Sequence, residues 1–240
     1  MVLKKNIYYL LILIIYNSCS YPELERDELI YSTSFNDGET GIEIDGGTVS
    51  LYNSEYVLGD FNNDGFTLHL NEIGNHDYIF VSFDLYIHGS WDGNFNGFKE
   101  NDKPDMWIME LRPDMNLYRD SDFDSFKTTF SNAPCFSNWC LRQSYPDPYP
   151  AENRPKMGYH ITDLPKKCSD SYYGGPTTLY KLEKSFKHSG NALVLRFYDE
   201  LYQPNAIDYQ GNNVEKCDES WSIDNLRVRA ISYKWKSSFL

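Results

Sequence analysis

The sequence predicts an all-β protein, a two-sheet antiparallel sandwich with long disulfide-stapled loops. Three observations lead to this class. Apolar residues alternate at every second position in several short segments, and turn residues separate these segments. Aromatic residues, which strands favour, make up 16% of the chain. No long stretch has the 3.6-residue period of an amphipathic helix.

The clearest predicted strand covers residues 79–87. Its apolar residues occupy every second position: Ile79, Val81, Phe83, Leu85 and Ile87. Such alternation predicts a strand with one face in a core. Three more sets repeat it: Trp107, Met109 and Leu111; Leu193, Leu195 and Phe197; Leu226, Val228 and Ala230.

The dipeptide Asp64-Gly65 separates 56–61 from 66–70, and it is typical of a tight turn between antiparallel neighbours. We therefore expect these two segments to form a hairpin. The preceding Asp60 also begins a near match to half of a calcium loop, but the plain turn is the favoured interpretation.

The N-terminus is typical of an export signal. Residues 1–18 hold two lysines followed by an apolar run, 7–16, that is too short to span a bilayer. In one interpretation signal peptidase cuts after Ser20. In the favoured one Cys19 is lipidated, since 16–19 resemble a loose lipobox. We expect a bacterial outer-membrane or cell-surface lipoprotein, with a freely secreted protein as the alternative.

The expected domain boundaries follow from this. Residues 1–18 are the signal peptide, 19–30 an acidic tether, 31–234 the jelly-roll sandwich and 235–240 a tail. The membrane is expected to be reached only through the lipid anchor.

Four further cysteines agree with an exported chain, because an even number suggests disulfides. Among three connectivities we favour Cys135–Cys140, which closes a short loop, together with Cys168–Cys217. A metal site is the alternative, but no histidine is spaced to complete one.

The charge limits the partners. The formal net charge is −13, and it becomes about −15 when residues 1–18, with two lysines and no acids, are removed. Nucleic acid and anionic membrane surfaces are poor partners for such a charge.

The middle third, about 116–175, is rich in proline, which central strands exclude. We expect ordered loops there, and loops over a sandwich are common binding sites. The aromatic candidates for stacking on a ligand are Trp139, Tyr145, Tyr149, Tyr172 and Tyr173.

One loop has the spacing of a cation site. Asp92, Asn94 and Asn96 lie two residues apart at the end of a strand, and Asp105 follows. Oxygen ligands in this spacing suit calcium. The twelfth loop position is Lys103 rather than glutamate, so this is no EF-hand. A polar hairpin loop without an ion is the alternative.

Asp224 is the third acidic feature. If Leu226 and Val228 face the core, the strand period places Asp224 on the same face, where a carboxylate needs a partner or an ion. Backbone hydrogen bonds, an arginine partner or a bulge near Ile223 that turns Asp224 outward are the alternatives.

Several segments share a recognisable set of motifs: 81–87, 90–94, 104–107, 128–132, 143–146 and 218–226. With them the chain resembles an extracellular jelly-roll module of bacterial secreted proteins. The opening segment 34–38 and the closing segment 223–226 also resemble the first and last strands of concanavalin A-like and carbohydrate-binding jelly rolls. That resemblance implies a structural calcium held by Asp37 and Asp224. Ser222 stands where the module usually has glycine.

These observations lead us to expect a non-catalytic module stabilised by calcium, with extracellular glycan as the ligand. The first alternative is an adhesion or assembly module that binds a surface protein. The second is a glycoside hydrolase using two carboxylates across a cleft, for which Asp84 and Glu110 are the candidates. No catalytic motif supports it, and His88 is better explained as a strand-end residue.

Overall fold

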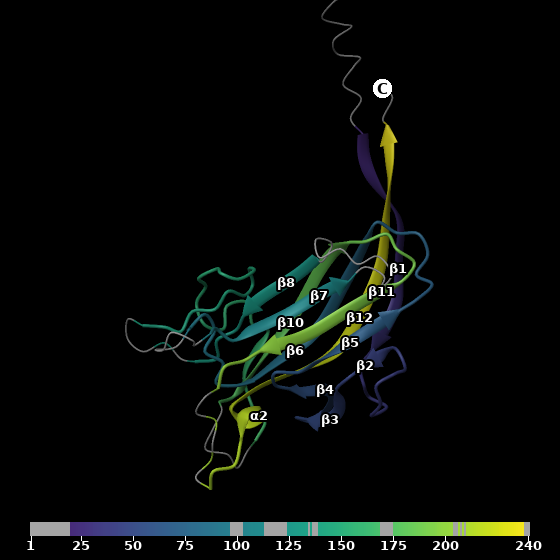
Figure 1. Cartoon of the computed structure of the whole chain (residues 1–240). Helices are drawn as coiled ribbons and strands as arrows, with labels where there is room; N and C mark the ends of the chain where they lie inside the picture. The colour runs from purple at the N-terminus through teal and green to yellow at the C-terminus, as the bar shows by residue number, and fades with distance from the viewer. Residues whose placement is uncertain are drawn as a thin grey trace, which may run out of the picture.

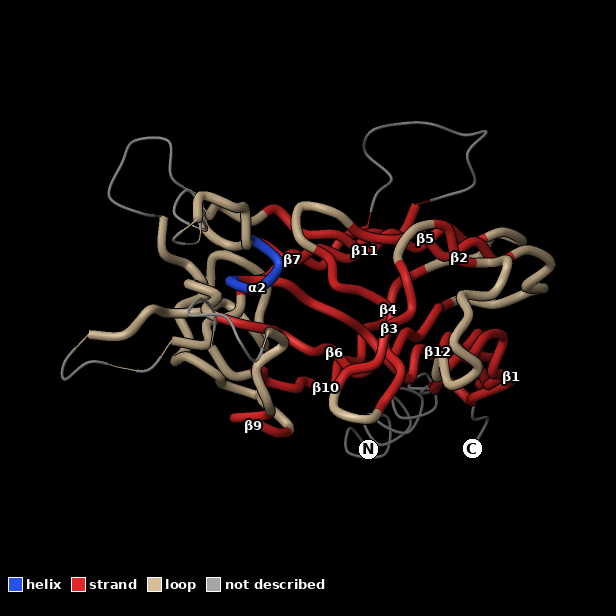
Figure 2. Tube along the Cα trace, turned by 90° about the horizontal axis from the view of Figure 1, so that it is seen from below, coloured by secondary structure: helices blue, strands red, loops and turns tan. Residues whose placement is uncertain are grey.

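The structure, a computed structural model, describes residues 20–96, 103–112, 124–133, 135, 139–168, 175–203, 206, 208 and 210–237. It confirms the predicted fold class, because two antiparallel sheets pack face to face (Figure 1). Two disulfides staple the segments outside the sheets. Figure 2 shows β5, β7 and β11 in one layer and β6, β10 and β12 in the other.

The larger sheet, sheet A, is seven-stranded with the order β3-β4-β12-β6-β10-β9, and β1 pairs with β12. Its members are β1 (Ser20–Thr33), β3 (Thr48–Tyr52), β4 (Glu55–Phe61), β6 (Tyr78–Gly89), β9 (Ile161–Leu164), β10 (Thr177–Lys187) and β12 (Glu219–Ser237).

Sheet B is five-stranded with the order β2-β5-β11-β7-β8. Its members are β2 (Ile44–Asp45), β5 (Gly65–Leu70), β7 (Met106–Arg112), β8 (Asp124–Thr129) and β11 (Leu193–Glu200). The short helix α2 (Glu215–Asp218) leads directly into β12.

The four predicted alternating sets are confirmed, because each lies buried between the sheets. Three fully buried tryptophans, Trp91, Trp107 and Trp221, are the largest side chains of this core. Ring contacts join them to their neighbours: Trp107 and Trp221 meet edge to face at 5.9 Å between centroids. Burial of these rings removes much apolar area from water and holds the sheets together.

The predicted hairpin at Asp64-Gly65 is wrong. β4 pairs with β12 in sheet A, whereas β5 pairs with β11 in sheet B, so the turn crosses from one layer to the other. Gly65 is needed for another reason: a Cβ there would lie 2.0 Å from the carbonyl oxygen of Phe197. The glycine allows close backbone approach rather than a two-strand turn.

The expected acidic tether is a strand instead. β1 pairs with β12 from Ser20 opposite Ser237 to Thr33 opposite Leu226. The side chains of Asp27 and Arg229 form an ion pair across the two strands. The described part of the fold therefore includes 20–30 and extends into the expected tail as far as residue 237, whereas Cys19, the signal peptide and 238–240 lie outside the described residues.

Both favoured disulfides, Cys135–Cys140 and Cys168–Cys217, are confirmed. Disulfides persist in oxidising compartments, so they indicate a location outside the cytoplasm. Within the described ranges, no helix has the length and apolar character needed to cross a bilayer.

Candidate functional site

Two of the predicted cation ligands come together at one end of the sandwich. Asp105 is buried at the start of β7, and its carboxylate accepts the backbone N–H of Asp92 at 2.7 Å. Gly93 permits this arrangement: its φ is +69°, and a Cβ would lie 2.1 Å from the Arg142 carbonyl oxygen. The loop predicted from its oxygen spacing is thus packed tightly against a second loop.

The other members of the predicted loop site point elsewhere. Asn94 uses its amide group to donate to the Ala151 carbonyl at 2.6 Å. Its amide oxygen accepts the hydroxyls of Ser144 and Thr129. Asn94 therefore fastens the proline-rich loop, and Asn96 is exposed beside it.

Asp224 is buried as expected, but it does not face the core. The register between β12 and β6 shifts between Asp224 and Arg227, and Asn225 has φ +52°. This bulge turns Asp224 to the outer face of sheet A, opposite Asp84, because one extra residue reverses the alternation. Burial, and next the Asp84 carboxylate, raise the pKa of Asp224 to about 6.

Asp37 lies in the exposed turn after β1, where its carboxylate accepts the backbone N–H of Glu39 at 3.2 Å. The carboxylate of Asp224 instead accepts hydrogen bonds from the backbone and side chain of Asn225. The shared calcium implied by the resemblance therefore remains a prediction for this pair.

Around Asp92 and Asp105 the structure adds acids that the sequence did not single out. Burial is the main cause that raises the pKa of Asp105 to about 8 and that of Asp92 to about 6. The next acidic influence on Asp92 is Asp218, and Glu219 is fully buried close to all three. We call Asp92, Asp105, Asp218 and Glu219 the rim cluster.

The sequence pattern that could have indicated these two acids is the pair Asp218-Glu219, which directly precedes a strand with a buried apolar face.

Asp199 of β11 lies beside the rim cluster, but it accepts three hydrogen bonds, from Trp221 Nε1 and from the N–H groups of Asn63 and Asp64. Among the described residues no three acidic, histidine or cysteine side chains are already spaced as a metal shell.

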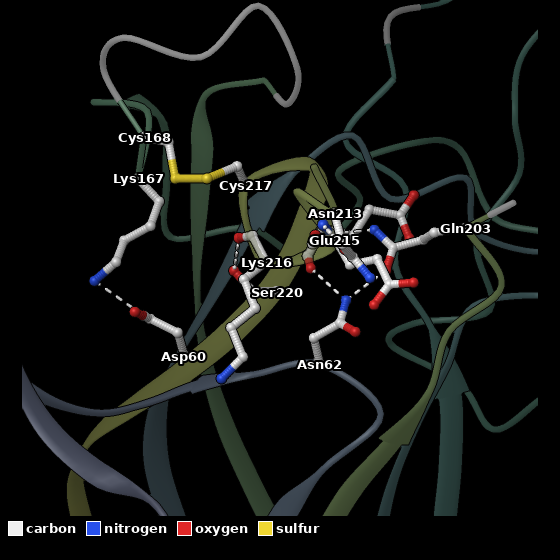
Figure 3. The surroundings of a disulfide bond; sticks show 11 residues. Asp60, Asn62, Lys167, Cys168, Gln203, Asn213, Glu215, Lys216, Cys217 and Ser220 are labelled. Atoms are coloured by element: carbon white, nitrogen blue, oxygen red, sulfur yellow. Dashed lines mark hydrogen bonds and ion pairs between the residues drawn. A yellow bond between two sulfur atoms is a disulfide. The ribbon is translucent and has the colours of Figure 1, made fainter. Parts of the chain in front are cut away.

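The Cys168–Cys217 disulfide joins the segment after β9 to α2 (Figure 3). Cys217 belongs to α2 and directly precedes Asp218. On the far side of the same bridge, Lys167 forms an ion pair with Asp60 at 2.9 Å. Asn62 donates to the carbonyl oxygen of Glu219 at 2.8 Å. Covalent and polar links thus fix where Glu219 enters β12.

The predicted stacking aromatics divide into three groups. Trp139 is 52% exposed and Tyr149 is 42% exposed, so both can meet a ligand. Tyr145 is buried against Phe130, so its predicted role in binding is wrong for the folded chain. The remaining two, Tyr172 and Tyr173, lie outside the described residues.

The outer face of sheet A carries a different candidate surface. An open pocket of about 630 Å³ contains Tyr78, Phe80 and Tyr233, and the rings of Tyr78 and Tyr233 meet edge to face at 5.9 Å. Its other lining residues are Pro22, Asp77, Ser185 and Lys187. Aromatic faces with polar groups around them are typical of ligand sites.

A second open pocket of about 430 Å³ continues along the same face. Its polar lining residues are Ser82, Asp84, Lys181, Glu183, Asn225 and Arg227. On β6, Phe80 lines the first pocket and Ser82 lines the second, and residues two positions apart in a strand share one face. We call the two pockets together the sheet-face groove, which runs for about 20 Å from Tyr78 to Asp84.

The carboxylates considered for a hydrolase do not share a cleft. Asp84 lies on the outer face of sheet A, where its side chain pairs with Lys181 at 3.5 Å. Glu110 lies on the outer face of sheet B, bonded to the Tyr198 hydroxyl at 2.6 Å. The core of the sandwich separates them, so this pair cannot attack one glycosidic bond.

His88 is equally unsuited to catalysis at the surface. It is 1% exposed and its ring bonds to the hydroxyls of Thr177 and Ser222, which are buried too. Burial is the main cause that lowers the pKa of His88 to about 3. The histidine is therefore a neutral part of the packing between β6 and β12.

Because unfolded His88 has an ordinary pKa near 6.5, the unfolded chain takes up a proton first as the pH falls. The contribution of neutral His88 to the free energy of unfolding is therefore fully present above pH 6.5, and it is lost as the pH falls towards 3. We expect His88→Gln to reduce the loss of unfolding free energy between pH 6.5 and 4.5 by about 2 kcal/mol, measured by urea titration. His160→Gln, at an exposed position, is the control and should leave the slope unchanged. An identical slope in all three proteins would contradict the assignment.

No protein-family profile matches the chain, and no curated protein sequence matches it.

Proposed function

We propose that the chain is an exported, non-catalytic module that binds extracellular glycan through the sheet-face groove. The observation that carries the proposal is the groove itself, with aromatic rings at one end and charged, hydroxyl and amide groups at the other. Rings offer flat apolar faces for sugar rings, and the polar end offers donors and acceptors for hydroxyl groups.

The charges in the groove favour a neutral glycan. Lys181 and Arg227 are balanced by Asp84 and Glu183 in the same pocket. Charged groups of both signs hydrogen-bond well to uncharged hydroxyls, whereas a polyanion would meet repulsion from the carboxylates. The net charge of −13 also disfavours a polyanion.

Export and anchoring are further parts of this proposal. The two disulfides support a location outside the cytoplasm, and we retain Cys19 as the lipidated residue, with secretion as the alternative. β1 begins at the free end of the β1–β12 ribbon, and α2 lies at the opposite end of the molecule (Figure 1). An anchor attached before β1 would leave the end of the sandwich that carries the rim cluster facing away from the membrane.

Calcium is the expected ion of the module, and we expect it to bind at the end that carries the rim cluster.

The glycan test uses Tyr233→Ala, which removes one ring of the groove from an already exposed position. We expect neutral polysaccharides to bind on a glycan array, and calorimetry should give about tenfold weaker binding for the variant, since a lost aromatic contact costs about 1.5 kcal/mol. Trp139→Ala, in the proline-rich loop, is the matched control and should bind normally.

Two outcomes would contradict the groove. Weakened glycan binding in Trp139→Ala but not in Tyr233→Ala would place the glycan site in the proline-rich loops instead. Absence of binding to any glycan, together with specific binding of a surface protein through the same face, would favour the adhesion or assembly module.

A further inference from the structure

The rim cluster unites carboxylates from three parts of the chain. Asp92 follows β6, Asp105 precedes β7, and Asp218 and Glu219 join α2 to β12. Hydrogen bonds hold the parts together. The Ser90 hydroxyl donates to Asp218 Oδ1 at 2.7 Å, and Asp105 accepts the N–H of Asp92. The acids therefore meet because of the fold and not because of their spacing in sequence.

Glu219 is the central observation. Its side chain is only 4% exposed, and its Oε2 atom is enclosed without a hydrogen bond from any described residue. The charged groups that act most strongly on it are all acidic: Asp105, Asp218, Asp92 and Asp199. A buried carboxylate oxygen that lacks a donor among the described residues and lies among other acids is costly, so this side chain requires a proton or a cation.

A cation satisfies the whole cluster better than protons do. Protons would have to bind to several of these acids one by one, whereas one divalent ion offsets charge on all four. Carboxylate oxygens are hard ligands, and calcium accepts six to eight oxygens in flexible geometry, more tolerantly than magnesium. The hydroxyl oxygen of Ser90 lies next to these carboxylates, because it donates to Asp218.

We propose that Asp92, Asp105, Asp218 and Glu219 form a divalent-cation site, with calcium as the preferred ion. The described side chains are not spaced as a finished shell, so binding requires them to move closer together. The inference deepens the calcium part of the proposed function, and it replaces Asn94 and Asn96 with Asp218 and Glu219 as ligands. It does not depend on glycan binding.

The experiment measures calcium binding to the intact protein, freed of metal with a chelator, by calorimetry and thermal unfolding. We expect one calcium per chain with a dissociation constant at or below about 10⁻³ M, the weak end of the range for extracellular modules, and a rise in Tm of several degrees. Magnesium should bind more weakly.

Glu219→Gln keeps the shape of the side chain and removes its charge. Two opposite effects are expected: a Tm equal to or above that of the wild type in chelator, and at least tenfold weaker calcium binding. Glu110→Gln, which removes a carboxylate on the outer face of sheet B, is the charge-matched control and should keep the full calcium response. Asp92→Asn, at a half-buried position, provides a second variant if Glu219→Gln fails to fold.

Three results would overturn the proposal. The first is the absence of both a heat of calcium binding and a change of Tm in the folded wild type at calcium concentrations up to about 10 mM, well beyond the expected range. The second is an unchanged calcium response in both Glu219→Gln and Asp92→Asn. The third is loss of the response in Asp224→Asn alone, which would place the ion with the site implied by the resemblance. Glycan binding that persists in each case would leave the groove proposal intact.

Discussion

Trp221→Ala is expected to lower the free energy of unfolding by about 3–5 kcal/mol, the cost typical of truncating a buried tryptophan. Trp221 is 0% exposed, and its ring packs against Phe61 at 4.5 Å between centroids. Its Nε1 also donates to Asp199 Oδ1 at 2.8 Å, so truncation both opens a cavity and removes a donor from a buried carboxylate. Urea denaturation at constant pH measures the loss.

Two variants control this experiment. Trp221→Phe retains much of the ring volume and should lose less than the alanine variant. Trp139→Ala removes a tryptophan from an exposed position and should stay within about 0.5 kcal/mol of the wild type. If Trp221→Ala were as stable as Trp139→Ala, the assignment of Trp221 to the core between the sheets would be wrong.

The second large effect is expected from the long disulfide. Cys168→Ala/Cys217→Ala opens a bridge of sequence separation 49, and loop-closure entropy predicts a loss of about 4 kcal/mol. Cys135→Ala/Cys140→Ala opens one of separation 5, and the same relation gives about 2 kcal/mol. Both double variants are compared with the wild type by urea denaturation.

The long bridge should also affect the rim cluster, because Cys217 directly precedes Asp218. Without it, calcium binding is expected to weaken in Cys168→Ala/Cys217→Ala and to persist in Cys135→Ala/Cys140→Ala. Equal stability losses in the two variants would show that unfolded-chain entropy is not the dominant effect. In that case native contacts around α2, such as the hydrogen bond from Gln203 to the Glu215 carbonyl, would account for most of the stability loss.

Strand prediction succeeded where one face of the strand is buried. Burial on a single face requires apolar residues at every second position, and 79–87 shows this in full. The tether prediction is wrong for 20–30, because a charged segment can also be a strand when its charges find partners. Asp27 instead pairs with Arg229 on a strand remote in sequence, and such a partner leaves no local pattern.

The error at Asp64-Gly65 has a similar origin. A glycine-containing turn specifies that the chain reverses or bends, but it does not specify which strand each flank will join. β4 and β5 join different sheets because each pairs with one strand, β12 or β11, that lies more than a hundred residues away. The same holds for Asp224, whose strand period was interrupted by a bulge at Asn225.

The sequence by itself determined the all-β class, the core face of the main strands, the two disulfides and the loop that brings Asp92 towards Asp105. These depend on local period, on cysteine count and on short spacing. Only the tertiary structure decided that β1 extends the sheet, that Asp224 faces outward and that Asp218 and Glu219 join Asp92. The physical reason is that strand pairing brings together residues far apart in the chain, and the electrostatic cost of buried carboxylates appears only once they meet.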